Sequence, residues 1–384
     1  MNKVSNASNS LIWVEGWGRG GIESFLKSLL SSRSIKSAGV KPDLFVVCDW
    51  SEGGLEDIRP LCNKVDVVFE GERPGLFKKA IHAIPALSRQ IGAGNYEVVY
   101  VNATNGMAFL YSFIAMIARV PVRIIHSHTA GFDDPSAGVW LKTAVHRICC
   151  ALFGWTATVR LATSEPAGAF LFDDKPFRVL PNGIDLGRFR FSETYRKDVR
   201  DCFDISDDSV VLGSVGRLEP VKNPLFQVSI FKEFHDIYPN SYLIMVGSGC
   251  LYDGVMQLIA NYGLSEHVFV VEGSGCPERY YSAMDCYLMP SIAEGFGISS
   301  VEAQCSGLRV LASMGVPSEI SFDNMVTFLS LENAPVVWAE KLCILLRMPT
   351  NRHDVSRLMQ GTGFDSEITA SSVVQVVSDW SHNA

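Results

Sequence analysis

MDCYLMPSIAEGFGISSVEAQCS, residues 284–306, is the segment that decides the fold of this chain. Residues 283–289 are mostly apolar, which is typical of a short buried strand, and Pro290 ends it because proline cannot donate to a ladder. A turn follows at 294–297, and the amphipathic stretch 298–305 predicts a helix. A strand, a glycine-containing loop and a helix start bring backbone N–H groups and the positive end of a helix dipole to one point, which suits a phosphate group.

Two carboxylates, Glu294 and Glu302, flank this predicted helix start. Their separation corresponds to a little over two helical turns, so both can face one cleft if Glu294 lies just before the first turn. The alternative interpretation is that they are ordinary surface carboxylates, favoured there by the helix dipole.

Length and composition indicate a large globular chain. At 384 residues it suits two domains of comparable size, and 47% hydrophobic with 19% charged residues indicates large buried sheets. The polar residues 1–10 do not resemble a signal peptide, and the longest apolar run, 107–118, is too short to span a bilayer. Ten scattered cysteines without a C-x-x-C pair indicate free thiols in a reducing cytoplasm rather than disulfides or a metal site.

Charge is unevenly distributed along the chain. Residues 1–190 carry 21 Lys/Arg and 17 Asp/Glu, a net charge of +4, whereas the remainder carries 12 and 24, a net charge of −12. The basic half contains the segment 73–90, which is predicted to be a basic amphipathic helix interrupted by Pro85. Such a helix can lie on an anionic membrane surface, although a solvated helix face over the core is the alternative. Its basic residues are Arg73, Lys78, Lys79, His82 and Arg89, and its apolar residues are Leu76, Phe77, Ile81, Ile84 and Leu87.

Short apolar strands alternate with predicted helices along the whole chain. We expect strands at 11–15, 44–48, 66–70, 96–101, 122–126, 161–164, 210–216, 242–247, 267–272, 283–289 and 308–312. This alternation predicts doubly wound parallel α/β sheets. We expect an N-terminal domain at 1–190, a polar surface connection at 191–208, a C-terminal domain at 209–365 and a final helix at 366–384.

The first strand leads into a glycine-rich loop. Gly16, Gly18 and Gly21 satisfy the G-x-G-x-x-G dinucleotide fingerprint, which makes a nicotinamide-dependent oxidoreductase one alternative. The acidic residue at the end of the next strand, Asp49, lies 28 residues after Gly21, farther than the usual spacing of about 20.

Two further positions lie where parallel sheets bind ligands. His126 is the last residue of the strand 122–126 and His128 follows it, so both lie at the carboxyl end of the strand and either can face a ligand. The ordinary alternative is a hydrogen-bonded surface histidine. In the second half, Arg217 and Lys222 lie in the loop after strand 210–216, where both can reach a diphosphate. No D-x-D metal-holding motif occurs in the sequence.

These motifs together resemble family 4 glycosyltransferases, which are retaining enzymes with the GT-B fold that use nucleotide-sugar donors. The resemblance rests on the paired glutamates, on Arg217-Leu-Glu-Pro-Val-Lys222-Asn, on Gly247-Ser-Gly249, on Gly20-Gly21-Ile-Glu and on Pro181-Asn-Gly-Ile-Asp185. It implies two Rossmann-like domains facing across a cleft, with the acceptor bound by the domain at 1–190 and the nucleotide sugar by the domain at 209–365. It also implies that the last helix crosses back to the first domain.

The resemblance also implies roles for these residues. Glu294 would hold sugar hydroxyls, Glu302 the ribose, Arg217 and Lys222 the diphosphate, and His126 or His128 the sugar being transferred. The implied catalytic residues are His128, His126, Arg217, Lys222 and Glu294. The implied donor-binding residues are Gly20, Gly21, Asn182, Gly216, Arg217, Lys222, Gly247, Gly249, Glu294, Gly295, Phe296, Gly297, Ile298 and Glu302.

The resemblance further implies a nucleoside-diphosphate sugar as co-substrate, no metal or other cofactor, and no nucleic-acid partner. The acceptor would be a saccharide, in particular a lipid-linked one, in bacterial capsule, exopolysaccharide or lipopolysaccharide synthesis. The enzyme would be cytoplasmic and peripheral at the inner face of the plasma membrane. A GT-B nucleotide-sugar epimerase and a catalytically silent binding module remain alternatives.

Overall fold

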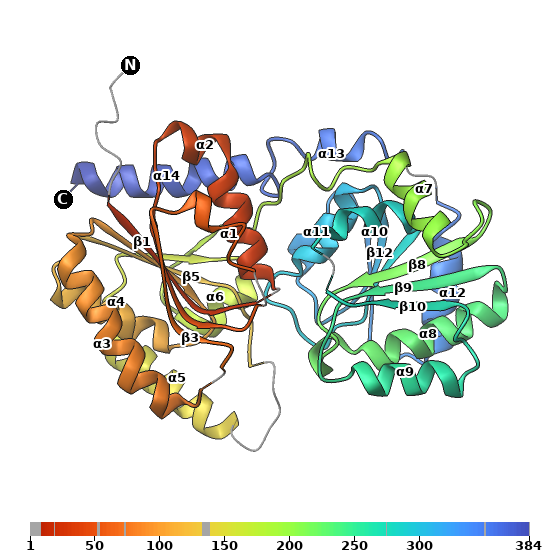
Figure 1. Ribbon diagram of the computed structural model, residues 1–384, viewed down its shortest axis with the longest axis horizontal. Coiled ribbons are helices and arrows are strands. Elements are labelled where there is room, and N and C mark those ends of the chain that lie inside the picture. The colour runs from red at the N-terminus through yellow and green to blue at the C-terminus, as the bar shows by residue number, and fades with distance from the viewer. Residues whose placement is uncertain are drawn as a thin grey trace. The chain divides into compact units, whose positions relative to one another are not determined.

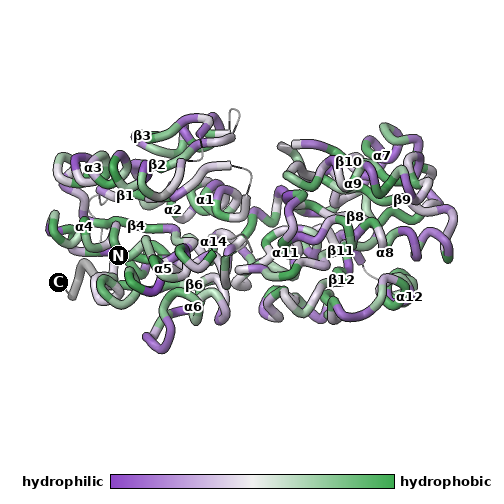
Figure 2. Tube along the Cα trace, turned by 90° about the horizontal axis from the view of Figure 1, so that it is seen from below, coloured by the Kyte–Doolittle hydropathy of each residue, from purple (hydrophilic) through white to green (hydrophobic). Residues whose placement is uncertain are grey.

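The computed structural model describes residues 9–383 except 19, 52–53, 73, 133–138, 274 and 349–350. It divides into two compact units, which are described separately below. The first contains the residues up to Gly183 and those from Gly363 onward, and the second contains Ile184–Thr362. Hydrophobic segments run through both units, and hydrophilic segments gather in the outer loops (Figure 2).

The first unit is built on a seven-stranded sheet in which every pairing is parallel. In spatial order the strands are β3 (Lys64–Glu70), β2 (Asp43–Asp49), β1 (Ser10–Trp17), β4 (Val98–Ala103), β5 (Val122–Ser127), β6 (Val159–Ala162) and β7 (Arg178–Val179). The chain moves outward from β1 to β3, returns to β4 beside β1, and then moves outward in the other direction. The sheet therefore has its topological switch point between β1 and β4.

Helices cover both faces of this sheet (Figure 1). One face carries α3 (Leu76–Gly94), α4 (Met107–Ile117), α5 (Val139–Phe153) and α6 (Glu165–Phe172). The other carries α1 (Gly21–Ser31), α2 (Arg33–Ser37) and α14 (Ser366–Asn383), and a short helix η1 (Arg59–Leu61) precedes β3. A strand that is covered by helices on both faces, such as β2, has a nearly continuous apolar sequence because neither of its faces is exposed to water.

The C-terminal helix α14 packs within the first unit. Its Glu367 carboxylate accepts hydrogen bonds from the backbone of Arg33 and Ser34 at 2.8 and 3.1 Å. Thr369 Oγ1 donates to the carbonyl of Pro181 at 3.2 Å. The chain thus returns from the second unit to the place where it left the first.

The second unit is built on a six-stranded parallel sheet. In spatial order the strands are β10 (Val268–Val271), β9 (Ser241–Val246), β8 (Val210–Val215), β11 (Cys286–Met289), β12 (Arg309–Ser313) and β13 (Val326–Leu329). Its switch point lies between β8 and β11. The prediction of doubly wound parallel sheets is therefore confirmed in both units.

Helices also cover both faces of the second sheet (Figure 1). One face packs against α8 (Pro224–Ile237), α9 (Tyr252–Asn261) and α12 (Pro335–Leu345). The remaining helices are α7 (Glu193–Cys202), η2 (Pro220–Lys222), α10 (Pro277–Ala283), α11 (Ile298–Cys305), η3 (Ser318–Ile320) and α13 (Val355–Leu358). Helix α11 has the bounds that the sequence predicts.

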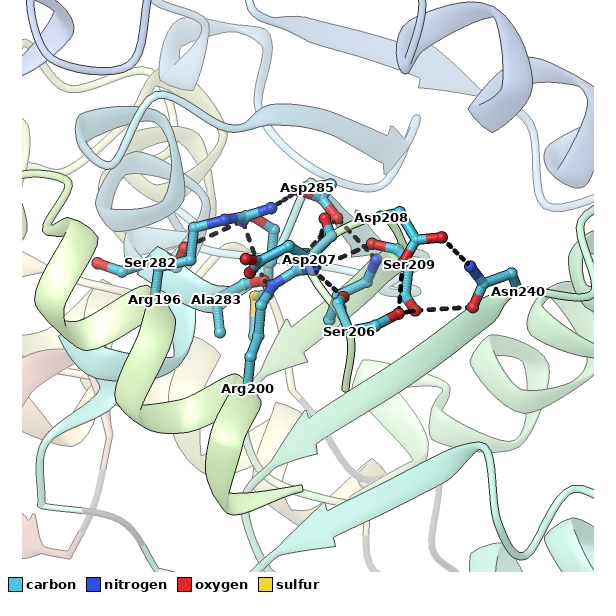
Figure 3. Close-up of polar contacts among 12 residues, drawn as sticks. Arg196, Arg200, Ser206, Asp207, Asp208, Ser209, Asn240, Ser282, Ala283 and Asp285 are labelled. Atoms are coloured by element: carbon cyan, nitrogen blue, oxygen red, sulfur yellow. Dashed lines mark hydrogen bonds and ion pairs between the residues drawn. The ribbon is translucent and has the colours of Figure 1, made fainter. Parts of the chain in front are cut away.

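The segment 191–208 differs from the surface connection that its polar sequence predicts. It contains α7, which belongs to the second unit, and the unit boundary falls at Gly183 rather than at residue 190. Arg200 of α7 is buried and donates to Asp285 Oδ2 at 2.7 Å, while Arg196 reaches Asp285 Oδ1 at 2.9 Å (Figure 3). These ion pairs allow a highly charged helix to pack against α10 and against the residues that precede β8 and β11.

Helix α3 occupies most of the segment 73–90, of which Arg73 lies outside the described residues. Leu87 is buried and Ile84 half-buried, whereas Phe77 and Ile81 are exposed. Among the helices of the described part of the chain, none combines the length and apolarity needed to cross a membrane.

Candidate functional site

A pocket opens at the switch point of the second sheet. Its lining includes Gly216 and Arg217, which follow β8, Lys222 at the end of η2, and Ser291, which follows β11. Parallel sheets bind ligands at this position, outside the carboxyl ends of the strands where the strand order reverses.

Close backbone packing holds the loop after β8 in place. Gly216 donates to the carbonyl of Val246 at 2.9 Å, and a Cβ on Gly247 would lie 1.9 Å from the carbonyl oxygen of Gly216. A Cβ on Gly249 would lie 2.5 Å from the carbonyl oxygen of Leu218. The predicted donor-binding glycines Gly247 and Gly249 are thus required for the approach of two loops.

The structure brings Lys222 and Glu294 together. Lys222 Nζ lies 2.6 Å from Glu294 Oε1, and both side chains are largely buried, at 23% and 9% exposure. A backbone hydrogen bond from Ile292 to the carbonyl of Val221, 2.7 Å long, joins the same two loops. The ammonium and the carboxylate therefore form a preorganised pair at the carboxyl ends of β8 and β11.

Gln227 of α8 fixes the position of the loop that carries Lys222 of the Lys222–Glu294 pair. Its Nε2 donates to the carbonyl of Lys222 at 3.1 Å, and its Oε1 accepts from Ser214 Oγ at 2.6 Å. The side chain is 5% exposed, so that its position is fixed by the core. Gln227 thus holds η2, which carries Lys222, against the end of β8.

Arg217 projects from the same loop toward the surface. Its side chain is 40% exposed and forms an ion pair with Glu219. An exposed ion pair of this kind is worth little and is readily exchanged for a stronger anion. Arg217 and Lys222 line one pocket, as expected for two cations that address one anionic group.

The start of α11 completes this side of the site. Gly297 is the N-cap residue with a left-handed φ of 83°, which favours glycine, and Phe296 before it is buried. In the described part of the chain no side chain caps this helix. The backbone N–H of Ser300 donates to the carbonyl of Gly297 at 2.9 Å, so the N–H groups of Ile298 and Ser299 remain for a ligand or solvent.

Glu302 lies one turn farther along α11 and has a different partner from Glu294. It is 4% exposed and accepts a hydrogen bond from the hydroxyl of Tyr281, in α10, at 2.7 Å. Burial raises the pKa of its carboxyl to about 7, against the opposing effects of the Tyr281 hydrogen bond and the nearby Arg188. A carboxylate held in this way can accept hydrogen bonds from vicinal hydroxyls once a ligand displaces water.

In the first unit, the two histidines at the end of β5 differ in exposure. His126 is fully buried: Tyr100 donates to its Nδ1 at 2.7 Å, and its Nε2 donates to the carbonyl of Leu180 at 3.2 Å. Burial lowers its pKa to about 3, so the ring is neutral. With no exposed surface, His126 does not reach a ligand in this conformation.

His128 is half-buried and is therefore the better candidate. Its Nε2 donates to Asn102 Oδ1 at 3.0 Å, and Asn182 Nδ2 approaches its Nδ1 at 3.5 Å. Burial lowers the pKa of His128 well below its usual value, so it too is neutral. The Oδ1 atom of Asn182 is buried without a hydrogen-bond partner among the described residues. Because buried polar atoms are normally hydrogen-bonded, this oxygen is available to accept a hydrogen bond from a ligand.

The glycine-rich loop after β1 has a packing role in the structure. A Cβ on Gly16 or Gly18 would lie 1.9 or 2.2 Å from the indole ring of Trp50. Gly20 is the N-cap residue of α1, Gly21 begins the helix, and Glu23 accepts from the backbone of Gly18 at 2.7 Å. The indole thus covers the surface that a dinucleotide fingerprint would present to a pyrophosphate, which weakens the oxidoreductase alternative.

Some residues of the site were not identified from the sequence. The Tyr287 hydroxyl donates to the carbonyl of Val215 at 3.0 Å and accepts from its amide at 3.1 Å, while Tyr281 and Gln227 position Glu302 and Lys222. Tyr287 and Gln227 are polar side chains within apolar segments, and that mismatch is the signal that could have revealed them, whereas Tyr281 lies in a mixed polar segment that gives no such signal. Among the described residues, no three His, Cys, Asp or Glu side chains cluster as metal ligands would.

Comparisons with known proteins agree with this geometry. Residues 196–357 match the family model described as Glycosyl transferases group 1. The protein EpsF of Bacillus subtilis (strain 168), whose name places it among the glycosyltransferases, is 27% identical over 281 residues, which cover 70% of this chain and 72% of EpsF. The UDP-Gal:alpha-D-GlcNAc-diphosphoundecaprenol alpha-1,3-galactosyltransferase of Escherichia coli is 29% identical over 61% of this chain and 62% of its own length.

The fold has clear counterparts among solved structures. Anabaena Alr3699/HepE in complex with UDP and glucose superposes with a TM-score of 0.76 over 97% of this chain and 100% of that chain, at 17% identity. At this identity the similarity shows the fold alone. The fold is thus GT-B, and the matched segment and the relatives show that the chain is similar to the group 1 glycosyltransferases.

Proposed function

We propose that the chain transfers a sugar from a nucleoside diphosphate to a hydroxyl of a saccharide acceptor, with retention of the anomeric configuration. The observation that carries this proposal is the Lys222–Glu294 pair at the switch point of the second sheet, beside Arg217 and the start of α11. This arrangement offers positive charge to a diphosphate and a carboxylate to sugar hydroxyls at one place.

The cations and the helix start act on the leaving group. When the anomeric C–O bond breaks, negative charge grows on the departing diphosphate. Lys222 and the N–H groups at the start of α11 are preorganised donors that stabilise this charge, and Arg217 adds a second cation once it exchanges Glu219 for the phosphate. The acceptor oxygen forms the new bond to the anomeric carbon, and its proton passes to an oxygen of the leaving phosphate.

The two glutamates hold parts of the donor that carry hydroxyls. Glu294 binds the sugar and is oriented by Lys222, whose ammonium can contact the carboxylate and a phosphate together. Glu302 binds the ribose, with Tyr281 fixing the orientation of its carboxylate. Because the ribose does not change in the reaction, Glu302 stabilises the substrate and the transition state alike.

His128 and Asn182 supply the polar groups of the first unit. Neutral His128 can exchange its long contact with Asn182 for a sugar hydroxyl, and the unpartnered Oδ1 of Asn182 can accept a hydrogen bond. We expect His128→Ala to lower kcat by roughly ten- to a thousandfold with little change in nucleotide affinity. Normal turnover by this variant would remove His128 from the site.

The names of relatives support the class of donor and acceptor. HepE was solved with UDP and glucose, and the Escherichia coli relative is named for transfer from UDP-Gal to a diphosphoundecaprenol-linked GlcNAc. A nucleotide-sugar donor and a lipid-linked acceptor in bacterial surface polysaccharide synthesis follow by analogy. An enzyme that uses a lipid-linked acceptor must reach the membrane surface. We propose that the enzyme is cytoplasmic and peripheral, and that it contacts the membrane through α3, where Phe77 and Ile81 are exposed beside Lys78.

Steady-state kinetics and product analysis test the proposal. Mass spectrometry of products from a panel of nucleotide sugars should show transfer that depends on an acceptor, whereas an epimerase would react without one. Removing Arg217 or Lys222 should lower kcat roughly ten- to a hundredfold each, and Glu302→Ala should mainly raise KM. Glu294→Gln should retain more activity than Glu294→Ala because an amide can still accept from a hydroxyl.

One outcome would overturn the proposal outright. If the double variant Arg217→Ala, Lys222→Ala turned over normally, the site would not stabilise a leaving phosphate. Glycosyl transfer at the switch point of the second sheet would then have to be abandoned.

A further inference from the structure

A buried tyrosine hydroxyl completes the end of β8 at the switch point of the second sheet. The pairing of β8 with β11 consists of Leu212 with Cys286 and Gly213 with Tyr287, and beyond it no described strand pairs with β8 on that side. The hydroxyl of Tyr287 accepts from the amide of Val215 at 3.1 Å and donates to the carbonyl of Val215 at 3.0 Å. It thus supplies the partner that the last backbone groups of β8 need and that a neighbouring strand would otherwise provide.

The same hydroxyl also holds the start of α11. A tyrosine hydroxyl has one proton to donate, and since this proton goes to the carbonyl of Val215, the hydroxyl of Ser299 must be the donor in its hydrogen bond with Tyr287. Tyr287 is 1% exposed, and burial raises the pKa of its hydroxyl, so the proton stays in place. Ser299 is the second residue of α11, and its backbone N–H is one of the two that remain for a ligand.

Two parts of the diphosphate site therefore meet at one oxygen atom. Val215 leads directly into the loop that carries Arg217, whereas Ser299 belongs to the first turn of α11. Tyr287 lines the pocket between them. Its proton and its acceptor positions are already taken by Val215 and Ser299, so the hydroxyl acts on a ligand only through the groups that it holds.

Other hydrogen bonds of this region join different elements. Gly216 donates to the carbonyl of Val246, which ties the loop after β8 to β9. Ile292 donates to the carbonyl of Val221, which ties that loop to the residues after β11. The contact through Tyr287 is the one that reaches the helix α11 itself. A diphosphate that binds both to the loop and to the helix start needs the two at a fixed separation, because stabilisation of its charge depends on donors that are already in place.

We propose that Tyr287 and Ser299 are positioning residues, which set the separation between the cation loop after β8 and the start of α11 and so match the site to the diphosphate of the donor. This inference rests on the proposed function and assigns a role to two residues around the same site. Neither residue needs to touch the nucleoside, so their loss should be felt in the binding of the phosphates and not in that of the nucleoside.

Nucleotide binding to the full chain tests this inference. Titration calorimetry with UDP, GDP, ADP, CDP and dTDP identifies the diphosphate that the wild type prefers, and competition against it gives the affinity of the corresponding nucleoside. Tyr287→Phe removes the hydroxyl but keeps the ring, whose centroid lies 5.7 Å from that of Tyr281. It should weaken binding of the diphosphate roughly three- to tenfold, as expected for the loss of hydrogen bonds, and leave nucleoside binding unchanged.

Variants of Ser299 show whether the two residues act together. Ser299→Ala should also weaken diphosphate binding, and Ser299→Thr, which keeps a hydroxyl, should restore it. The double variant Tyr287→Phe, Ser299→Ala should bind no more weakly than Tyr287→Phe alone, because the second change removes a contact that is already lost. The matched control Tyr242→Phe removes a hydroxyl near the amino end of β9, at the opposite end of the same sheet, and should change nothing.

The outcomes separate this inference from the proposed function. Unchanged diphosphate binding in Tyr287→Phe and Ser299→Ala, an equal loss for the diphosphate and the nucleoside, or additive effects in the double variant would overturn the positioning role and leave the donor site standing. If the wild type bound none of the five diphosphates, the proposed function would fail, and this inference with it. A thermal unfolding curve shows that each variant is folded, and should Tyr287→Phe not fold, Ser299→Ala against Ser299→Thr decides the matter.

Discussion

Lys222 and Glu294 were predicted separately, one as a phosphate ligand and the other as a sugar ligand, and the structure joins them at 2.6 Å. The sequence could not show this contact because the two residues lie on different loops, 72 positions apart. The pairing has a functional consequence. Each residue holds the other in place before the donor arrives, so the loss of one must change what the other does.

This dependence predicts a strong coupling between the two residues. In a double-mutant cycle of Lys222→Ala and Glu294→Gln, the effects on kcat/KM should be non-additive by about 0.5–3 kcal/mol, as is usual for residues in direct contact. Steady-state kinetics of the four proteins measures this coupling. Additive effects would mean that the two side chains act independently in the reaction.

Glu302 predicts a dependence of stability on pH. Burial raises its pKa from 4.5 to about 7, so between these values the folded state holds a proton that the unfolded state has lost. The free energy of unfolding therefore falls as pH rises through this range, by roughly 3 kcal/mol at most. Glu302→Gln removes this penalty and keeps an oxygen for the Tyr281 hydroxyl.

The measurement is thermal unfolding at pH 5 and at pH 8. The Tm of Glu302→Gln should exceed that of wild type by several degrees more at pH 8 than at pH 5, since about 1 kcal/mol shifts Tm by roughly 2–4 °C in a domain of this size. The matched control Glu332→Gln changes an exposed glutamate of the same unit and should show no such difference. An equal Tm difference at both pH values would contradict a raised pKa.

At the level of elements, the sequence predicted what periodicity and turn residues determine locally. Helix α11 and the strands leading to both switch points were found, because apolar runs bounded by glycine and proline define them. Helix α7 and the strands β7 and β13 were missed. Nothing in the polar run 191–208 indicates that it is buried. Arg200 can be buried because its hydrogen-bond partners come from 206–209 and 283–285, and the second of these segments is distant in the sequence.

Arg200 is therefore expected to contribute strongly to stability. It donates to Asp285 and to the carbonyls of Ala283, Ser206 and Ser209, all of which lose a donor when Arg200 is replaced (Figure 3). Arg200→Met should lower the free energy of unfolding by about 3–5 kcal/mol, as expected when one partner of a buried ion pair is removed. Urea denaturation measures the change.

A matched variant tests whether the loss of stability comes from the burial of the ion pair or from the removal of a charge. Lys232→Ala removes a cation from an exposed pair with Asp236 on α8 and should cost less than about 1 kcal/mol. Equal losses from Arg200→Met and Lys232→Ala would show that α7 is not anchored by its ion pairs.

At the scale of the whole molecule, the boundary between the units falls within the turn 181–185 and not at the polar run 191–208. A Cβ on Gly183 would lie 2.7 Å from the carbonyl oxygen of Asp365, so the chain needs glycine where its outgoing and returning segments pass each other. Which residues meet in a pocket could not be predicted, because a pocket beside Glu15 in the first unit draws on segments from residue 15 to residue 145.

The charge and the exposed apolar residues of the first unit bear on membrane contact. The helices α3, α4 and α5 leave Phe77, Ile117 and Trp140 at least 65% exposed, and Trp155, in the turn after α5, is 62% exposed. Basic residues, among them Lys78 and Arg147, are exposed on the same helices. Aromatic side chains beside cations are favoured at the surface of an anionic bilayer. The structure therefore extends the expected contact from α3 to α5.

We predict that this layer binds anionic vesicles. Flotation with phosphatidylglycerol-containing vesicles should recover the wild type. Two double variants should each reduce this recovery severalfold: Phe77→Ser with Ile81→Ser, and Trp140→Ser with Trp155→Ser. Each pair removes apolar area that would enter the membrane interface. Ile237→Ser with Ile344→Ser removes comparably exposed side chains from the second unit and serves as the control. Added salt should weaken the contribution of Lys78 and Arg147 more than that of the aromatic residues, since screening acts on charge and not on apolar burial. Equal recovery of all four proteins would mean that these residues are an ordinary solvated surface and that a lipid-linked acceptor is reached by another route.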